Sequence, residues 1–209
     1  MTKEVNMGCA APHPFHWADL RSCPADRVIA REGVKVSKDG KGYELAFLNA
    51  VYEIDPVDER IGEISPQPSR DLTEMFQILL IQYLLAPMGG PIDGNEISEK
   101  DCPGGVTFFQ GPHALYVSPI AKLYGRNPDA FEKRGRELNA QFASHGDAAI
   151  RFLPFPEIPV TYVLWTADDE FPASVSVLFD SSINRWFELD MIFSLVWVLT
   201  ERIVEESGV

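Results

Sequence analysis

The sequence has few cysteine residues, which limits both its compartment and its metal chemistry. Only three cysteines occur among 209 residues, too few for the closed disulfide framework that holds small secreted domains together. Residues 1–6 also lack the apolar segment of a secretory signal. We therefore expect a folded, soluble protein in a reducing cytoplasm.

Basic residues are scarce as well. The chain has 18 Lys and Arg residues against 31 Asp and Glu residues, a formal net charge of −13, and such a surface repels phosphate backbones and anionic lipids. Long hydrophobic runs are absent too, because the two most apolar segments, 78–85 and 191–199, are shorter than the ~20 residues that cross a bilayer. The sequence therefore predicts neither a nucleic-acid nor a membrane partner.

The motifs of several large enzyme classes are missing. The sequence has no phosphate-binding loop with its lysine, no dinucleotide fingerprint after a strand, no nucleophile elbow and no paired histidines on a helix. This favours a protein that is not an enzyme, and no cofactor is identified.

The periodicity predicts one α+β domain over residues 29–209, preceded by an N-terminal arm at residues 1–28, with regular structure starting near Ile29. A β-meander is expected at the start of the domain, because Asp39-Gly40 favours a tight hairpin turn. Its four strands should lie at 34–36, 43–48, 51–54 and 60–64.

Two long apolar helices are expected to pack a mainly antiparallel sheet. The first should run from a cap at Asp71 to about Ala86, with Leu80 in the core, and the second from Glu188 to about Glu205, with Leu195 in the core. Shorter helices are expected after Ser118-Pro119 and after Asn127-Pro128, and a short strand at 106–109.

Three consecutive acidic residues, Asp168, Asp169 and Glu170 (the acidic triplet), stand between two apolar segments. The segment 160–165 is hydrophobic throughout, which predicts a central strand buried on both faces, while 173–179 alternates like a half-exposed neighbour. The triplet could bind a hard divalent cation or make the charged contact to another ligand. The alternative is a solvated hairpin turn.

Asp180 is a further acid near these strands. If the two segments pair antiparallel, Asp180 lies at the end of the pair opposite the triplet, so one site cannot include all four acids. Asp180, Glu188 and Asp190 are better explained as turn and cap residues.

Two other groups of residues are candidates for a site. The Gly-rich connection at residues 88–112 and its flank bring potential ligand-binding residues together, namely Cys102, Gly104, Gly105 and His113. Cys102 and His113 could pair as nucleophile and base, although a buried cysteine and a satisfied histidine are the favoured interpretation. The arm carries four donors that zinc accepts, Cys9, His13, His16 and Cys23, but their spacing matches no standard zinc site.

Several short motifs carry a family resemblance. They are Pro103-Gly104-Gly105, Phe108-Phe109, Leu123-Tyr124-Gly125, Asp129, Phe131, Gly146-Asp147, residues 155–159, Trp165, the acidic triplet with Phe171-Pro172, and residues 178–180. Over residues 104–199 the chain resembles an uncharacterised family of bacterial and archaeal proteins from strict anaerobes, a domain of unknown function (DUF3786).

The resemblance implies a redox or cofactor-handling context, because some members of that family are fused to an iron-sulfur domain. This chain lacks the four clustered thiolates that an iron-sulfur cluster needs. The sequence therefore favours an accessory cytoplasmic protein of anaerobic metabolism that binds a small molecule or cofactor between the 88–112 loop and the acidic triplet. The alternatives are a metal-dependent enzyme that uses the triplet and a structural or interaction module, and self-association is compatible with the sequence.

Overall fold

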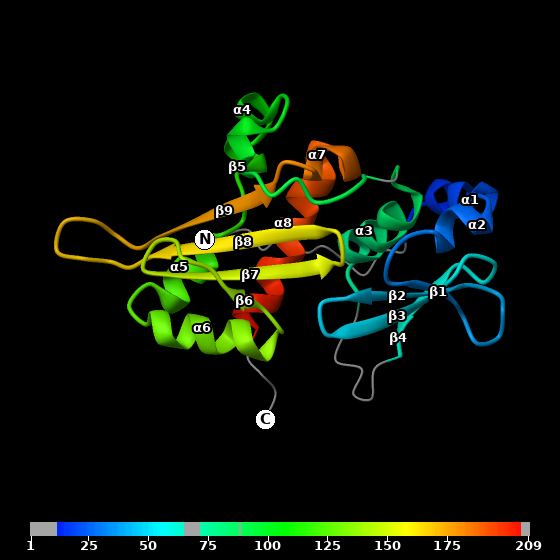
Figure 1. The fold of residues 1–209 in the computed structure, drawn as a ribbon, viewed down its shortest axis with the longest axis horizontal. Helices are drawn as coiled ribbons and strands as arrows, with labels where there is room; N and C mark the ends of the chain where they lie inside the picture. The colour runs from blue at the N-terminus through cyan, green and yellow to red at the C-terminus, as the bar shows by residue number, and fades with distance from the viewer. Residues whose placement is uncertain (1–11, 65–71, 88, 206–209) are drawn as a thin grey trace, which may run out of the picture. The chain divides into compact units, whose positions relative to one another are not determined.

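The computed structural model describes residues 12–64, 72–87 and 89–205 (Figure 1). The backbone forms two compact units, residues 1–86 and 87–209. In the described ranges the fold is α+β, with one antiparallel sheet of four strands, another of five, and eight α-helices. The predicted α+β class is thus confirmed, with two sheets where one was expected. The division into an arm at 1–28 and one domain at 29–209 stays a prediction.

The four-stranded sheet belongs to the first unit and is the predicted meander. Its strands, in the order β1-β2-β3-β4, are Val34–Val36, Tyr43–Phe47, Ala50–Asp55 and Arg60–Glu63, and each pairs antiparallel with the next.

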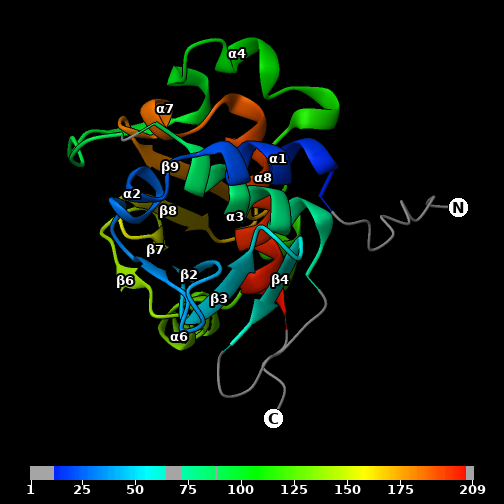
Figure 2. The same cartoon turned by 90° about the vertical axis from the view of Figure 1, so that its right-hand side faces the viewer.

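Helices precede this sheet, so the expectation that regular structure starts near Ile29 was wrong. Helix α1 covers Pro14–Ser22 and α2 covers Ala25–Ile29. Proline at the first turn of α1 favours a helix rather than breaking it. Trp17 and Leu20 are both buried, and α1 lies beside α3 (Figure 2).

Helix α3, Glu74–Leu85, packs on the meander. Its cap is Thr73, whose Oγ1 accepts a hydrogen bond from the N–H of Phe76 at 3.3 Å, and not the predicted Asp71, which lies outside the described residues. The Phe76 ring contacts the rings of Phe47 and Tyr52, with centroid distances of 4.8 and 5.0 Å. Leu80 is fully buried, as predicted.

The five-stranded sheet belongs to the second unit. Its antiparallel strands, in the order β5-β9-β8-β7-β6, are Glu96–Ser98, Ser174–Asp180, Ile158–Trp165, Ala148–Phe155 and Gln141–Phe142. Strand β8 is central and is buried along its length except at Trp165, which confirms the prediction from its continuous hydrophobicity.

Three helices of the second unit lie together on one side of this sheet: α5 (Ser118–Tyr124), α6 (Pro128–Glu137) and α8 (Leu189–Val204) (Figure 1). The buried Tyr162 on β8 donates to the carbonyl of Val196 in α8 at 3.1 Å, and Tyr124 donates to the carbonyl of Ile203 at 3.0 Å. Leu195 is fully buried, as predicted.

The segment between β5 and α5 is mostly turns and short helices. These are α4 (Gly105–Phe108) and the 3₁₀ turns Glu99–Asp101 and Gly111–His113, while α7 (Ile183–Trp186) follows β9. The short strand expected at 106–109 was wrong, because a four-residue apolar run has no periodicity that separates strand from helix. No helix of the described ranges has the length and apolarity needed to cross a membrane.

Candidate functional site

The loop between β8 and β9 carries the acidic triplet, and its first residues are fixed by Asp147. Oδ2 of Asp147 accepts hydrogen bonds from the hydroxyl and the N–H of Thr166, at 2.6 and 2.7 Å. These bonds favour the charged carboxylate and hold the pKa of Asp147 below its usual range. Gly146 precedes it with φ of +55°, and a Cβ there would approach the carbonyl oxygen of Leu164 to 2.7 Å. Glycine at position 146 therefore allows the Gly146-Asp147 pair to pack closely against the end of β8.

A second anchor joins the loop to the turn between α5 and α6. The N–H of Ala167 donates to the carbonyl of Gly125 at 2.9 Å. Gly125 is buried, and a Cβ at this position would overlap the carbonyl oxygen of Ala121 and the Cβ of Ala173. Glycine is thus required here by close approach rather than by its backbone angles.

The first acid of the triplet is a turn residue. Oδ1 of Asp168 accepts hydrogen bonds from the N–H groups of Glu170 and Phe171, at 2.8 and 2.6 Å, and the N–H of Asp168 donates to the carbonyl of Phe171 at 3.0 Å. This is the local pattern by which aspartate stabilises a turn. The remaining two acids, Asp169 and Glu170, are exposed at its tip.

A pocket of about 470 Å³ lies between this loop and the α5–α6 turn. We call it the loop pocket, and its lining comprises residues 167–173 together with residues 121–127 other than Tyr124. Its volume lies within the range of about 300–1,000 Å³ that is usual for small-molecule sites. The acidic triplet therefore lines a pocket, but the opposite wall is formed by residues 121–127 and not by the expected 88–112 loop.

Four of the five charged residues of the loop pocket have no partner among the described residues, the exception being Asp168. Lys122, Arg126, Asp169 and Glu170 are all exposed, and none takes part in an ion pair or a side-chain hydrogen bond in the described part of the chain. Beside the hydrogen-bonded Asp168, two cations and two anions thus line one pocket without neutralising each other.

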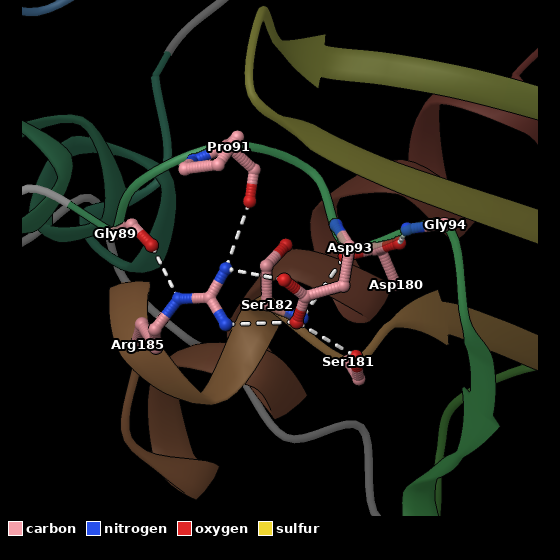
Figure 3. Close-up of polar contacts among 8 residues, drawn as sticks. All are labelled: Gly89, Pro91, Asp93, Gly94, Asp180, Ser181, Ser182 and Arg185. Atoms are coloured by element: carbon pink, nitrogen blue, oxygen red, sulfur yellow. Dashed lines mark hydrogen bonds and ion pairs between the residues drawn. The ribbon is translucent and has the colours of Figure 1, made fainter.

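Unlike the exposed charges of the loop pocket, Asp180 is buried and has hydrogen-bond partners within the protein (Figure 3). It is 1% exposed, and its carboxylate accepts hydrogen bonds from the N–H groups of Asp93 at 2.9 Å, Gly94 at 2.7 Å and Ser182 at 3.0 Å. Burial alone would raise its pKa, but these bonds outweigh it and hold the pKa below the usual value. The interpretation of Asp180 as a turn residue agrees with this geometry.

Arg185 completes this network (Figure 3). Its guanidinium donates to both carboxylate oxygens of Asp93, at 2.8 and 3.0 Å, to the carbonyl of Pro91 at 2.8 Å and to the carbonyl of Gly89. The ion pair lowers the pKa of Asp93, assisted by the Ser181 hydroxyl. These charges fasten residues 89–94 to the end of β9 and are satisfied by the protein itself.

The other predicted ligand residues lie apart from the loop pocket. Cys102, Gly104, Gly105 and His113 are not among its lining residues. Cys102 is 3% exposed, and burial raises the pKa of its thiol, whose Sγ lies 3.9 Å from the carbonyl of Ser98. The His113 ring stacks on Phe108 at 4.7 Å. Within the described ranges Cys102 and His113 share no hydrogen bond, so the geometry gives no support to a nucleophile–base pair.

The donors predicted in the arm do not converge in the described residues. Cys9 lies outside them. The His13 ring stacks on Phe15 at 4.6 Å, Nδ1 of His16 lies 3.1 Å from Nε2 of Gln82, and Cys23 is a free, half-buried thiol. Across the part of the chain that the structure describes, no three His, Cys, Asp or Glu side chains are placed to hold one metal ion.

Sequence reasoning missed Lys122 and Arg126. They flank Leu123-Tyr124-Gly125, a motif that carries the family resemblance but has no predicted role. The motif now has one, because Gly125 permits the contact with the β8–β9 loop and the two cations beside it line the loop pocket.

Comparison with known proteins agrees with the resemblance found in the sequence. No curated protein and no solved structure matches the chain. A family model described as "Domain of unknown function (DUF3786)" matches residues 25–202, which include both sheets and the loop pocket. The chain therefore belongs to the family described as domain of unknown function DUF3786.

Proposed function

We propose that this protein binds a small molecule in the loop pocket and acts as an accessory cytoplasmic protein of anaerobic metabolism rather than as an enzyme. The observation that carries the proposal is the contrast between two sets of charges. Asp93, Asp180 and Arg185 have hydrogen-bond or ion-pair partners within the fold. In the loop pocket only Asp168 does, and the side chains of Lys122, Arg126, Asp169 and Glu170 have no partner among the described residues.

The construction of the loop supports the same proposal. Bonds from Thr166 to Asp147 and from Ala167 to Gly125, together with the turn at Asp168, fix the backbone on which Asp169 and Glu170 stand. A rigid backbone presents charged groups to a ligand at a lower entropic cost than a loose one. A pocket beside the triplet also favours ligand binding over a pure interaction module.

A metal-dependent enzyme at the triplet has less support. One oxygen of Asp168 is already occupied by two N–H groups, and Lys122 and Arg126 line the same pocket, where they would repel a divalent cation. Neither observation affects the binding of an organic ligand that carries charged groups of its own.

Native mass spectrometry tests the proposal. Protein purified under anaerobic conditions from its own host should carry a bound small molecule, and the Arg126→Gln and Glu170→Gln variants should retain less of it. Glu132→Gln and Lys133→Gln are matched controls, because these residues of α6 do not line the pocket. Equal retention of one ligand by the pocket variants and the controls would place the site elsewhere.

A further inference from the structure

The charges of the loop pocket are arranged in two walls of opposite sign. Lys122 and Arg126 come from α5 and from the turn that follows it, while Asp169 and Glu170 come from the β8–β9 loop. The two walls lie on segments that are far apart in the sequence and are held together by the hydrogen bond between Ala167 and Gly125. The separation of the charges is therefore built into the fold.

This arrangement discriminates between classes of ligand. An anion would be attracted by Lys122 and Arg126 but repelled by the acidic wall. A cation would be attracted by the acidic wall but repelled by Lys122 and Arg126. A molecule with one group of each sign gains at both walls. It also neutralises side chains that have no partner within the described ranges.

The lining between the charges is partly apolar. Leu123 and Phe171 are 54% and 66% exposed, and both line the pocket together with Pro172. Large apolar side chains exposed beside a pocket are favourable contacts for the hydrocarbon part of a ligand.

We propose that the ligand is a small zwitterion with an apolar body, either a free apolar amino acid or a short apolar peptide. Its carboxylate contacts Lys122 and Arg126, and its ammonium group contacts Asp169 and Glu170. This inference rests on the proposed function of the loop pocket. The volume of about 470 Å³ leaves room for either source of the same chemistry.

Isothermal titration calorimetry with matched probes tests the charge requirement. Leucine and the dipeptide Leu-Leu are the zwitterions, and their difference in affinity identifies the source. Isopentylamine and isocaproate keep the leucine side chain but lack the carboxylate and the ammonium group, respectively. The better zwitterion should bind at least about tenfold more tightly than either, the effect of one lost charge-assisted contact.

Two pocket variants test which wall contacts the carboxylate of the ligand and which contacts its ammonium group. Arg126→Gln should weaken binding of the zwitterion and of isocaproate but not that of isopentylamine, which loses a repulsion. Glu170→Gln should weaken binding of the zwitterion and of isopentylamine but not that of isocaproate, which loses a repulsion. The controls Lys133→Gln and Glu132→Gln should behave as wild type, and thermal unfolding of all four variants verifies that each is folded.

The possible outcomes distinguish failure of this inference from failure of the proposed function on which it rests. Equal affinity for a zwitterion and a single-charge analogue, or no binding of either zwitterion, overturns the inference. Inorganic phosphate and putrescine then serve as anion-only and cation-only probes. If one of these probes binds and its binding depends on Arg126 or Glu170, the loop pocket is still a binding site but for another class of ligand. If no probe shows binding that depends on either residue, the proposed function is overturned as well.

Discussion

The N–H of Ala167 donates to the carbonyl of Gly125 at 2.9 Å, and this bond joins two segments more than 40 residues apart in the sequence. One segment carries the acidic triplet and the other carries Lys122 and Arg126. The bond forms only because Gly125 has no Cβ to separate the α5–α6 turn from Ala173. The loop pocket therefore depends on one close backbone approach.

Replacement of Gly125 by alanine should open this contact. The new Cβ would overlap the Ala121 carbonyl and Ala173, so the turn must move away from the loop. We expect a loss of about 1–3 kcal/mol in the free energy of unfolding, as for other overpacked sites, together with loss of ligand binding. Urea unfolding measures the first effect. Gly62→Ala is the control, because a Cβ at Gly62 meets no atom within 4 Å, and equal losses in both variants would contradict the explanation.

Asp147 should make the stability of the β8–β9 loop depend on pH. Its pKa is lowered from the usual 3.8 by the hydrogen bonds from Thr166, so its contribution is complete above that value and is lost as the pH falls through the lower, folded-state pKa. The Asp147→Asn variant should be less stable than wild type at pH near 7, and the difference should shrink below pH of about 4. Urea titrations at both pH values measure it. A difference that stays constant would mean that the charge of Asp147 plays no part.

Local patterns were sufficient to predict much of the fold. The turn at Asp39-Gly40 predicted the β1–β2 hairpin, and the unbroken hydrophobicity of 160–165 predicted the central position of β8. Both features follow from a few adjacent residues. The acidic triplet was equally visible, since three acids between apolar strands are conspicuous in a sequence.

Features that depend on distant contacts were not predicted. Nothing near Lys122 or Arg126 reveals that the β8–β9 loop lies beside them, because the contact is made by the backbone of Ala167. The division of strands between two sheets was missed for the same reason, since each strand pattern is compatible with either arrangement. Helix α1 was missed because it is short and its residues show no clear apolar periodicity.

Trp17 should be essential for the first unit, although it lies in a segment that the sequence indicated as an arm. Its side chain is 1% exposed on α1, which lies against α3. Trp17→Ala should lower the free energy of unfolding by about 3–5 kcal/mol, the usual cost of removing a buried aromatic side chain. Phe15→Ala on the same helix should cost little, because Phe15 is 72% exposed. Chemical denaturation of the two variants compares them, and a small effect at Trp17 would mean that α1 contributes little to stability.

Asp180 and Asp169 should respond in opposite ways to loss of charge. The Asp180 carboxylate is buried and accepts three backbone hydrogen bonds, from Asp93, Gly94 and Ser182. In Asp180→Asn one acceptor oxygen becomes an N–H₂ group that faces a donor, so we expect a loss of about 2–3 kcal/mol in unfolding free energy. Asp169→Asn removes an exposed charge beside Glu170 that has no partner in the part of the chain that the structure describes, and the stability of this variant should equal or exceed that of wild type. Thermal unfolding of both variants at neutral pH provides the comparison. Destabilisation by Asp169→Asn would show that this carboxylate has a structural partner and would weaken the case for a ligand at the loop pocket.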